Sequence, residues 1–170
     1  FKVTKNGEYV FKVYDNVGNE RVESISISNI DNTAPEMNLI YNNVDWAKSI
    51  EVNIDISDND SGVDYILLPD GTKVKGDSAT FEVSKNGEYI FKAYDKLGNE
   101  KVEKINITTI DIEPPEINVV YDKESPLTSI DIKISAVDNK SGVDYILLPD
   151  GTKVKGDSAT FKASENKVYT

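Results

Sequence analysis

Residues 61–80 read SGVDYILLPDGTKVKGDSAT, and the same residues occur without a change at positions 141–160. The similarity extends outward in the same register, because FKVTKNGEYVFKVYDNVGNERVESISI at residues 1–27 returns as FEVSKNGEYIFKAYDKLGNEKVEKINI at residues 81–107. The chain is therefore a tandem array with a period of 80 residues. Solenoid repeats of about 20–50 residues need neighbours to bury a core, whereas a unit of this length can form a small domain of its own.

The composition excludes several classes of function. The chain carries 30 acidic and 19 basic residues and a net charge of -11, which disfavours binding to nucleic acid or to an anionic membrane. It contains no cysteine and no histidine, so disulfides, thiolate or imidazole metal ligands and histidine-activated nucleophiles are absent. No apolar run is long enough for membrane insertion. No signal peptide or initiator methionine is present, so we expect a segment of a longer chain.

Apolar and polar residues alternate with a period of two along several segments. Ile50, Val52, Ile54 and Ile56 fall on one face of residues 49–57, with polar residues on the other. Such alternation is typical of half-buried antiparallel strands, and Asn-Gly and Asp-Gly turn sequences separate the segments. We predict no helix, and we predict strands near residues 37–41, 49–57, 63–68, 72–75, 79–84, 88–95 and 100–110.

Proline marks the junctions between repeats, because it cannot donate to a sheet ladder. Pro35 and the pair Pro114-Pro115 each follow a long predicted strand. We therefore predict three parts, the C-terminal part of a repeat at 1–33, a complete repeat at 34–112 and the N-terminal part of the next repeat at 113–170. About seven short strands per repeat predict an all-β fold of tandem immunoglobulin-like antiparallel β-sandwiches.

The frame NGEYIFKAYDKLGNEKVEKINITTID at residues 86–111, followed by a Pro-marked junction and by DNKSGVDYILLPDG at residues 138–151, resembles the bacterial immunoglobulin-like repeats of large surface proteins. The resemblance covers the whole chain and concerns turns and fold rather than chemistry. It implies an extracellular setting, on the cell surface or in the cell wall, and a spacer or adhesive role without a named ligand.

The acidic segment before and after Gly62 is the sharpest candidate for a metal site. Carboxylates spaced around a glycine bend could converge on Ca²⁺, which binds six to eight oxygen atoms. Against this, Lys140 replaces one of these carboxylates in the next repeat. The competing interpretation is that Asp58 and Asp138 cap tight turns. No other cofactor is expected. The candidate calcium ligands are Asp55, Asp58, Asp60 and Asp64.

Two further groups of oxygen-rich side chains have simpler interpretations. Asp95 lies with Asn99 and Glu100 in a loop that turn formation alone explains. Asp31 and Asp111 lie beside the junctions, where calcium stiffens the linker in some bacterial repeats of the kind this chain resembles.

Trp46 is the only tryptophan and lies in the predicted loop 42–48. A loop-borne tryptophan could serve as a stacking platform for a carbohydrate ligand. The equivalent residue of the next repeat is Pro126, so the repeat does not require an aromatic residue there. The competing interpretation is that Trp46 covers the end of its own sandwich.

The sequence favours a mechanical function. We expect a stalk, spacer or fibre-forming repeat whose partners are neighbouring repeats and other copies in a fibre or surface layer. One alternative is an adhesive module that binds a glycan or host protein through its inter-strand loops, and another is an accessory domain of a secreted enzyme. The chain itself is not expected to be an enzyme, because an 80-residue sandwich with short loops leaves no cleft.

Overall fold

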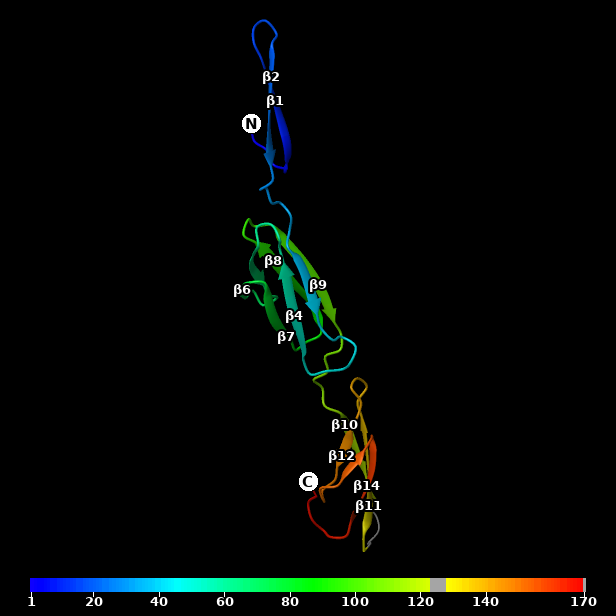
Figure 1. Ribbon diagram of the computed structural model, residues 1–170. Coiled ribbons are helices and arrows are strands. Elements are labelled where there is room, and N and C mark those ends of the chain that lie inside the picture. Colours follow the sequence, from blue (N-terminus) through cyan, green and yellow to red (C-terminus); the bar gives the residue numbers. More distant parts are fainter. Residues whose placement is uncertain (123–127, 170) are drawn as a thin grey trace. The chain divides into compact units, whose positions relative to one another are not determined.

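The computed structural model describes residues 1–122 and 128–169 (Figure 1). These residues form antiparallel sheets and no helix, so none of them forms a helix that could cross a membrane. The predicted all-β class is thereby confirmed. Pro126, which we compared with Trp46, lies outside the described residues.

Fourteen strands account for the regular structure of the described residues. They are β1 (Gly7–Tyr14), β2 (Glu20–Ile27), β3 (Glu36–Ile40), β4 (Ile50–Ser57), β5 (Val63–Leu67), β6 (Lys73–Lys75), β7 (Ser78–Val83), β8 (Gly87–Asp95), β9 (Glu100–Ile107), β10 (Glu116–Val120), β11 (Ile130–Val137), β12 (Tyr145–Leu147), β13 (Lys153–Lys155) and β14 (Ser158–Ala163).

The chain is divided into two compact units. The first unit comprises Phe1–Tyr41, Glu51–Glu82 and Gly87–Asn106, and the second comprises Asn42–Ile50, Val83–Asn86 and Ile107–Thr170. The repeat boundaries inferred from the prolines stay a prediction.

Strands β1 and β2 form a hairpin whose register runs from Gly7 opposite Ile27 to Tyr14 opposite Glu20. Its apolar side chains are largely open to solvent, with Phe11 exposed by 40% and Val13 by 66%. The corresponding side chains of the homologous hairpin β8–β9 are fully buried. The two hairpins are thus similar in sequence but differ in how far their apolar side chains are buried.

Two sheets of the first unit share one core. One sheet has the strand order β3-β4-β7 and the other the order β6-β5-β8-β9. The predicted alternation of β4 is confirmed, because every second side chain from Ile50 to Ile56 is buried. Phe81 on β7 meets Phe91 on β8 edge to face, with ring centroids 5.8 Å apart. This contact joins the inner faces of the two sheets.

The second unit contains a smaller core of the same kind. Its sheets have the orders β10-β11-β14 and β12-β13. Alternate residues of β11 point into this core, as those of β4 do in the first unit. The buried residues are Ile134, Ala136, Ile146 and Leu148.

The predicted strand at 100–110 is three residues too long, since β9 ends at Ile107. The next residues leave the ladder with β8 because they pair elsewhere in the second unit. The amide of Ala47 donates to the carbonyl of Thr109 at 2.9 Å, and the amide of Asp111 donates to the carbonyl of Ala47 at 2.9 Å. The side-chain amide of Asn86 also bonds both backbone groups of Ile110 at 2.8 Å.

Candidate functional site

Asp58 and Asp138 cap equivalent turns, as one of the two sequence interpretations predicts. Asp58 Oδ1 accepts hydrogen bonds from the amides of Asp60 at 3.1 Å and Gly62 at 2.7 Å. Gly62 has φ +80°, a left-handed conformation that a residue with a side chain adopts at a cost. In the next repeat Asp138 Oδ1 accepts from the amides of Lys140 and Gly142 at 2.9 and 3.0 Å.

A second pair of aspartates, Asp31 after β2 and Asp111 after β9, reaches these turns. Asp31 Oδ2 accepts a hydrogen bond from the amide of Ser61 at 3.1 Å, while its Oδ1 accepts from the amide and hydroxyl of Thr33. Asp111 Oδ2 accepts from the amide of Ser141 at 3.2 Å. We call the bonds Asp31–Ser61 and Asp111–Ser141 the first and second junction contacts. Each ties the segment after one hairpin to the turn that follows the second strand of the next repeat.

Asp95 is a buried carboxylate at the turn between β8 and β9, with 2% of its surface exposed. Its Oδ1 accepts from the amides of Leu97 and Asn99 at 2.9 and 2.7 Å, and its Oδ2 accepts from the side-chain amide of Asn99 at 2.6 Å. Burial raises the pKa of Asp95, but the hydrogen bonds from Asn99 and its neighbours outweigh burial and hold the pKa below its usual value. Asp95 is therefore a buried negative charge.

The fold brings Asp31, Asp58 and Asp95 together. One carboxylate oxygen from each lies within 4.8 Å of the others, and this is the only such group of three acidic residues among the residues that the structure describes. A hydrogen bond from the hydroxyl of Ser61 is the largest cause of the lowered pKa of Asp31, and the same hydroxyl also lowers the pKa of Asp95. We call these three carboxylates the aspartate cluster.

Only one of the four predicted calcium ligands belongs to the aspartate cluster, namely Asp58. Asp55 points to the exposed face of β4, because its neighbours Ile54 and Ile56 occupy the buried face. Asp64 is exposed on β5. Asp60 is exposed in the turn, where its carboxylate accepts a long hydrogen bond from the hydroxyl of Thr33 at 3.4 Å.

Asp31 makes stability depend on pH in a defined window. Hydrogen bonds from Ser61 and Thr33 lower its pKa from 3.8 to about 2 in the folded chain. A folded pKa below the unfolded value stabilises the fold fully above about pH 4, and this stabilisation is lost as pH falls towards 2. We expect Asp31→Asn, measured in EDTA, to lose less stability than the unchanged chain between pH 4 and pH 2. Urea midpoints across this range test this, and parallel curves for the two proteins would contradict it.

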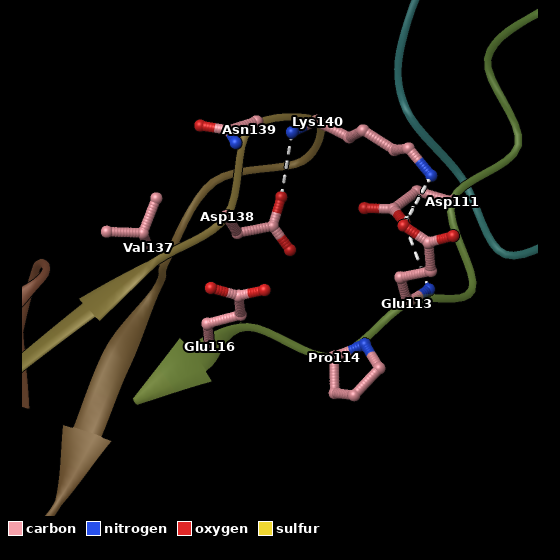
Figure 2. A pocket seen from close by; sticks show the side chains of 8 residues that line it. All are labelled: Asp111, Glu113, Pro114, Glu116, Val137, Asp138, Asn139 and Lys140. Carbon is pink, nitrogen blue, oxygen red and sulfur yellow. Dashed lines mark hydrogen bonds and ion pairs between the residues drawn. The ribbon is translucent and has the colours of Figure 1, made fainter. Parts of the chain in front are cut away.

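The ammonium group of Lys140 lies beside the second junction contact. Lys140 Nζ lies 2.8 Å from Glu113 Oε2 and 4.0 Å from Asp111 Oδ1. Figure 2 shows the Lys140 side chain extending from the turn towards these two carboxylates, at the side of a pocket of about 260 Å³. The hydroxyl of Ser141 is the first cause, and Lys140 a further cause, of the lowered pKa of Asp111.

Trp46 is 43% exposed and lies in the segment between β3 and β4. It lines a pocket of about 490 Å³ in the second unit, together with Asp111 and the Pro114-Pro115 pair. A partly exposed aromatic side chain can stack on a ligand, and carboxylates line the same pocket. The side chain therefore stays a candidate for binding.

The sequence contains every member of the aspartate cluster, but sequence reasoning assigned Asp31, Asp58 and Asp95 to three separate loops. The repeat itself gives no signal that joins them, because an 80-residue period without insertions preserves every spacing alike. No protein-family model and no curated protein matches the chain. Sequence and structure together establish an all-β chain of antiparallel sheets, with 14 strands consistent with roughly two units of about seven strands.

Proposed function

We propose that this chain is a structural spacer, a segment of an extracellular bacterial surface protein built from immunoglobulin-like β-sandwich repeats. The observation that carries this proposal is the repetition of the junction contact. Asp31–Ser61 and Asp111–Ser141 use the same atoms, at 3.1 and 3.2 Å, at two successive places along the chain. A chain whose task is reach and presentation benefits from junctions that are ordered in the same way each time.

The strand order of the first unit supports an immunoglobulin-like repeat. Such sandwiches place their first, second and fifth strands in one sheet and their third, sixth and seventh strands in the other. Numbered from β3, the observed orders β3-β4-β7 and β6-β5-β8-β9 follow this division, and the fourth strand, β6, pairs with the third, β5, instead of joining the sheet of the first strand. The shared core, through the contact of Phe81 with Phe91, fits two sheets packed face to face.

The surface also suits a spacer. The net charge of -11 keeps neighbouring chains apart in solution, and the acidic side chains of strands such as β4 lie on their exposed face. The junction segments are short and contain proline, which restricts the backbone more than a glycine-rich linker does. Residues 61–80 and 141–160 have the same sequence, which fits the interchangeable units that a spacer requires.

The conformational order of each junction can be measured directly with spin labels on introduced cysteines, because the chain contains no cysteine of its own that would also react. One pair of labels at Arg21 and Lys75 spans the first junction contact, and a second pair at Lys104 and Lys155 spans the second; all four side chains are exposed. Pulsed electron paramagnetic resonance then gives the width of each distance distribution.

We expect narrow distributions for the unchanged junctions. Asp31→Ala should broaden only the distribution across the first junction, and Asp111→Ala only that across the second, because each removes one junction contact. Asp70→Ala, in an exposed turn away from both contacts, serves as the matched control. Distributions that are equally broad with and without the aspartates would contradict the spacer proposal.

A further inference from the structure

Two asparagine side chains hold the ends of equivalent hairpins in the same way. Asn6 donates through Nδ2 to the carbonyl of Ile30 and accepts through Oδ1 from the amide of Ile30, both at 2.8 Å. Asn86 makes the same two bonds with Ile110, also at 2.8 Å. We call these pairs the first and second amide contacts. Each fixes the segment after a hairpin to the residue before it, because the side chain satisfies a donor and an acceptor of that segment's backbone.

The residue after each of these asparagines is glycine, and the backbone conformation favours it. Gly7 has φ +154° and Gly87 has φ +153°, values that a residue with a side chain rarely adopts. The amide contact in turn requires asparagine, because no other side chain of this length carries both a donor and an acceptor at its end. Two separate demands of the fold thus place an Asn-Gly dipeptide at the start of β1 and at the start of β8.

An Asn-Gly dipeptide is chemically labile in water. The backbone nitrogen of the glycine attacks Cγ of the asparagine, so an N–Cγ bond forms and the Cγ–Nδ2 bond breaks. Nδ2 leaves as ammonia with the proton that the glycine nitrogen gives up, and a succinimide ring remains. Water then opens the ring at either carbonyl to give aspartate or isoaspartate, so the reaction consumes one water and releases one ammonia. Glycine favours the attack because it has no Cβ to obstruct it.

The amide contact restrains this reaction in the folded chain. While Oδ1 and Nδ2 of Asn86 are both bonded to Ile110, Cγ is not free to turn towards the nitrogen of Gly87. The two contacts differ in burial, because Ile110 is 3% exposed, whereas Ile30 is half-buried and its bonds with Asn6 are exposed. Exposed hydrogen bonds open more readily than packed ones, so the first contact should protect its asparagine less.

We propose that Asn6 and Asn86 are sites of spontaneous deamidation, and that loss of the amide group undoes the amide contact. A carboxylate at position 86 can accept from the amide of Ile110 but cannot donate to its carbonyl. Its second oxygen then faces the carbonyl oxygen, and their repulsion weakens the attachment of residues 108–111. The same change at position 6 weakens the attachment of residues 28–31. The hairpin ends are therefore held by contacts of limited lifetime, and this inference does not depend on the spacer proposal.

The test uses the full 170-residue chain, incubated in a mildly alkaline buffer and digested at intervals for peptide mapping by mass spectrometry. The chain carries its own control, because the third equivalent asparagine, Asn166, is followed by Lys167. We expect conversion first at Asn6, more slowly at Asn86 and most slowly at Asn166. In urea, Asn6 and Asn86 should convert at the same rate, because KNGEY surrounds both. This rate should exceed that of Asn86 in the folded chain at least about fivefold, since two hydrogen bonds no longer restrain the side chain.

Two results of the peptide mapping would contradict the proposal. Conversion at Asn6 and Asn86 that is no faster than at Asn166 would overturn the assignment of the two sites. Equal rates for Asn86 in the folded and the unfolded chain would show that the amide contact does not restrain the reaction.

The variant Asn86→Asp reproduces one product of the reaction and tests its structural effect. Hydrogen exchange in the peptide that carries residues 108–111 should be about twofold to tenfold faster, because one hydrogen bond is lost. Asn53→Asp is the matched control, since it adds the same charge on the exposed face of β4 and should leave this peptide unchanged. Unchanged exchange in a folded Asn86→Asp chain would refute the proposed effect on the contact. Peptide mapping uses the unchanged chain, so the sites are tested even if this variant folds poorly.

Discussion

Replacing Phe91 with alanine is expected to lower the free energy of unfolding of the first unit by about 3–5 kcal/mol. Among the residues that the structure describes, Phe91 is the largest fully buried side chain, with 0% of its surface exposed. Its ring meets Phe81 edge to face and so joins the two sheets of the core. Truncation removes this contact and leaves a cavity that the rigid strands around it cannot fill. Since small domains are stable by only about 5–15 kcal/mol, much of the stability is lost.

The measurement is urea unfolding followed by far-ultraviolet circular dichroism, with hydrogen exchange of the peptide that carries β8 as a local readout. Ile90→Ala is the matched control, because Ile90 is the neighbouring residue on the opposite face of β8 and is 38% exposed. Its truncation should cost less than about 1 kcal/mol. Equal effects of the two substitutions would show that the core is not where the structure places it.

Asp95→Ala is expected to cost about 3 kcal/mol in the presence of EDTA, because it leaves the donors at the β8–β9 turn without their acceptor. Those donors are the amides of Leu97 and Asn99 and the side-chain amide of Asn99, and their shared acceptor is buried. Relief of repulsion within the aspartate cluster offsets part of this loss. Asp95→Asn should recover only part of the stability, since its side-chain NH₂ would face the NH₂ of Asn99.

The same unfolding assay tests this second expectation, with Asp70→Ala as the control. Asp70 also accepts a hydrogen bond from a turn amide, at 2.9 Å, but it does so in solvent. Water replaces the lost acceptor there, so only a slight change in the urea midpoint is expected. If Asp70→Ala and Asp95→Ala shift the midpoint equally, burial of the carboxylate contributes nothing to the fold.

The strands were largely predictable because their signals are local. Alternation along residues 49–57 identified both β4 and its buried face, and turn sequences identified the ends of most other strands. The end of β9 was not predictable, because Thr109 and Asp111 bond to Ala47, which is distant in the sequence. Side-chain alternation carries no information about such a partner.

The candidate site was predictable in part for the same reason. The capping role of Asp58 follows from spacing within one turn, and the hydrogen bonds confirm it. The meeting of Asp58 with Asp31 and Asp95 depends on how three loops are placed by the sheets between them. That placement is a property of the packed core, so no pattern around any one of these residues reveals it.

The identity of residues 61–80 and 141–160 has a consequence for how the chain reaches its fold. Strand β8 pairs with β5 through Tyr65, Ile66 and Leu67, and β12 presents the same three residues in the same order. During refolding from denaturant both strands are present at once, and β8 meets two partners with identical local pairing energies. During synthesis β5 is complete before β12 exists, so β8 can pair with β5 before the competing strand is present. Neighbouring repeats of high identity are prone to exchanging strands. Synthesis from the N-terminus therefore disfavours pairing of β8 with β12, whereas refolding by dilution from urea allows it.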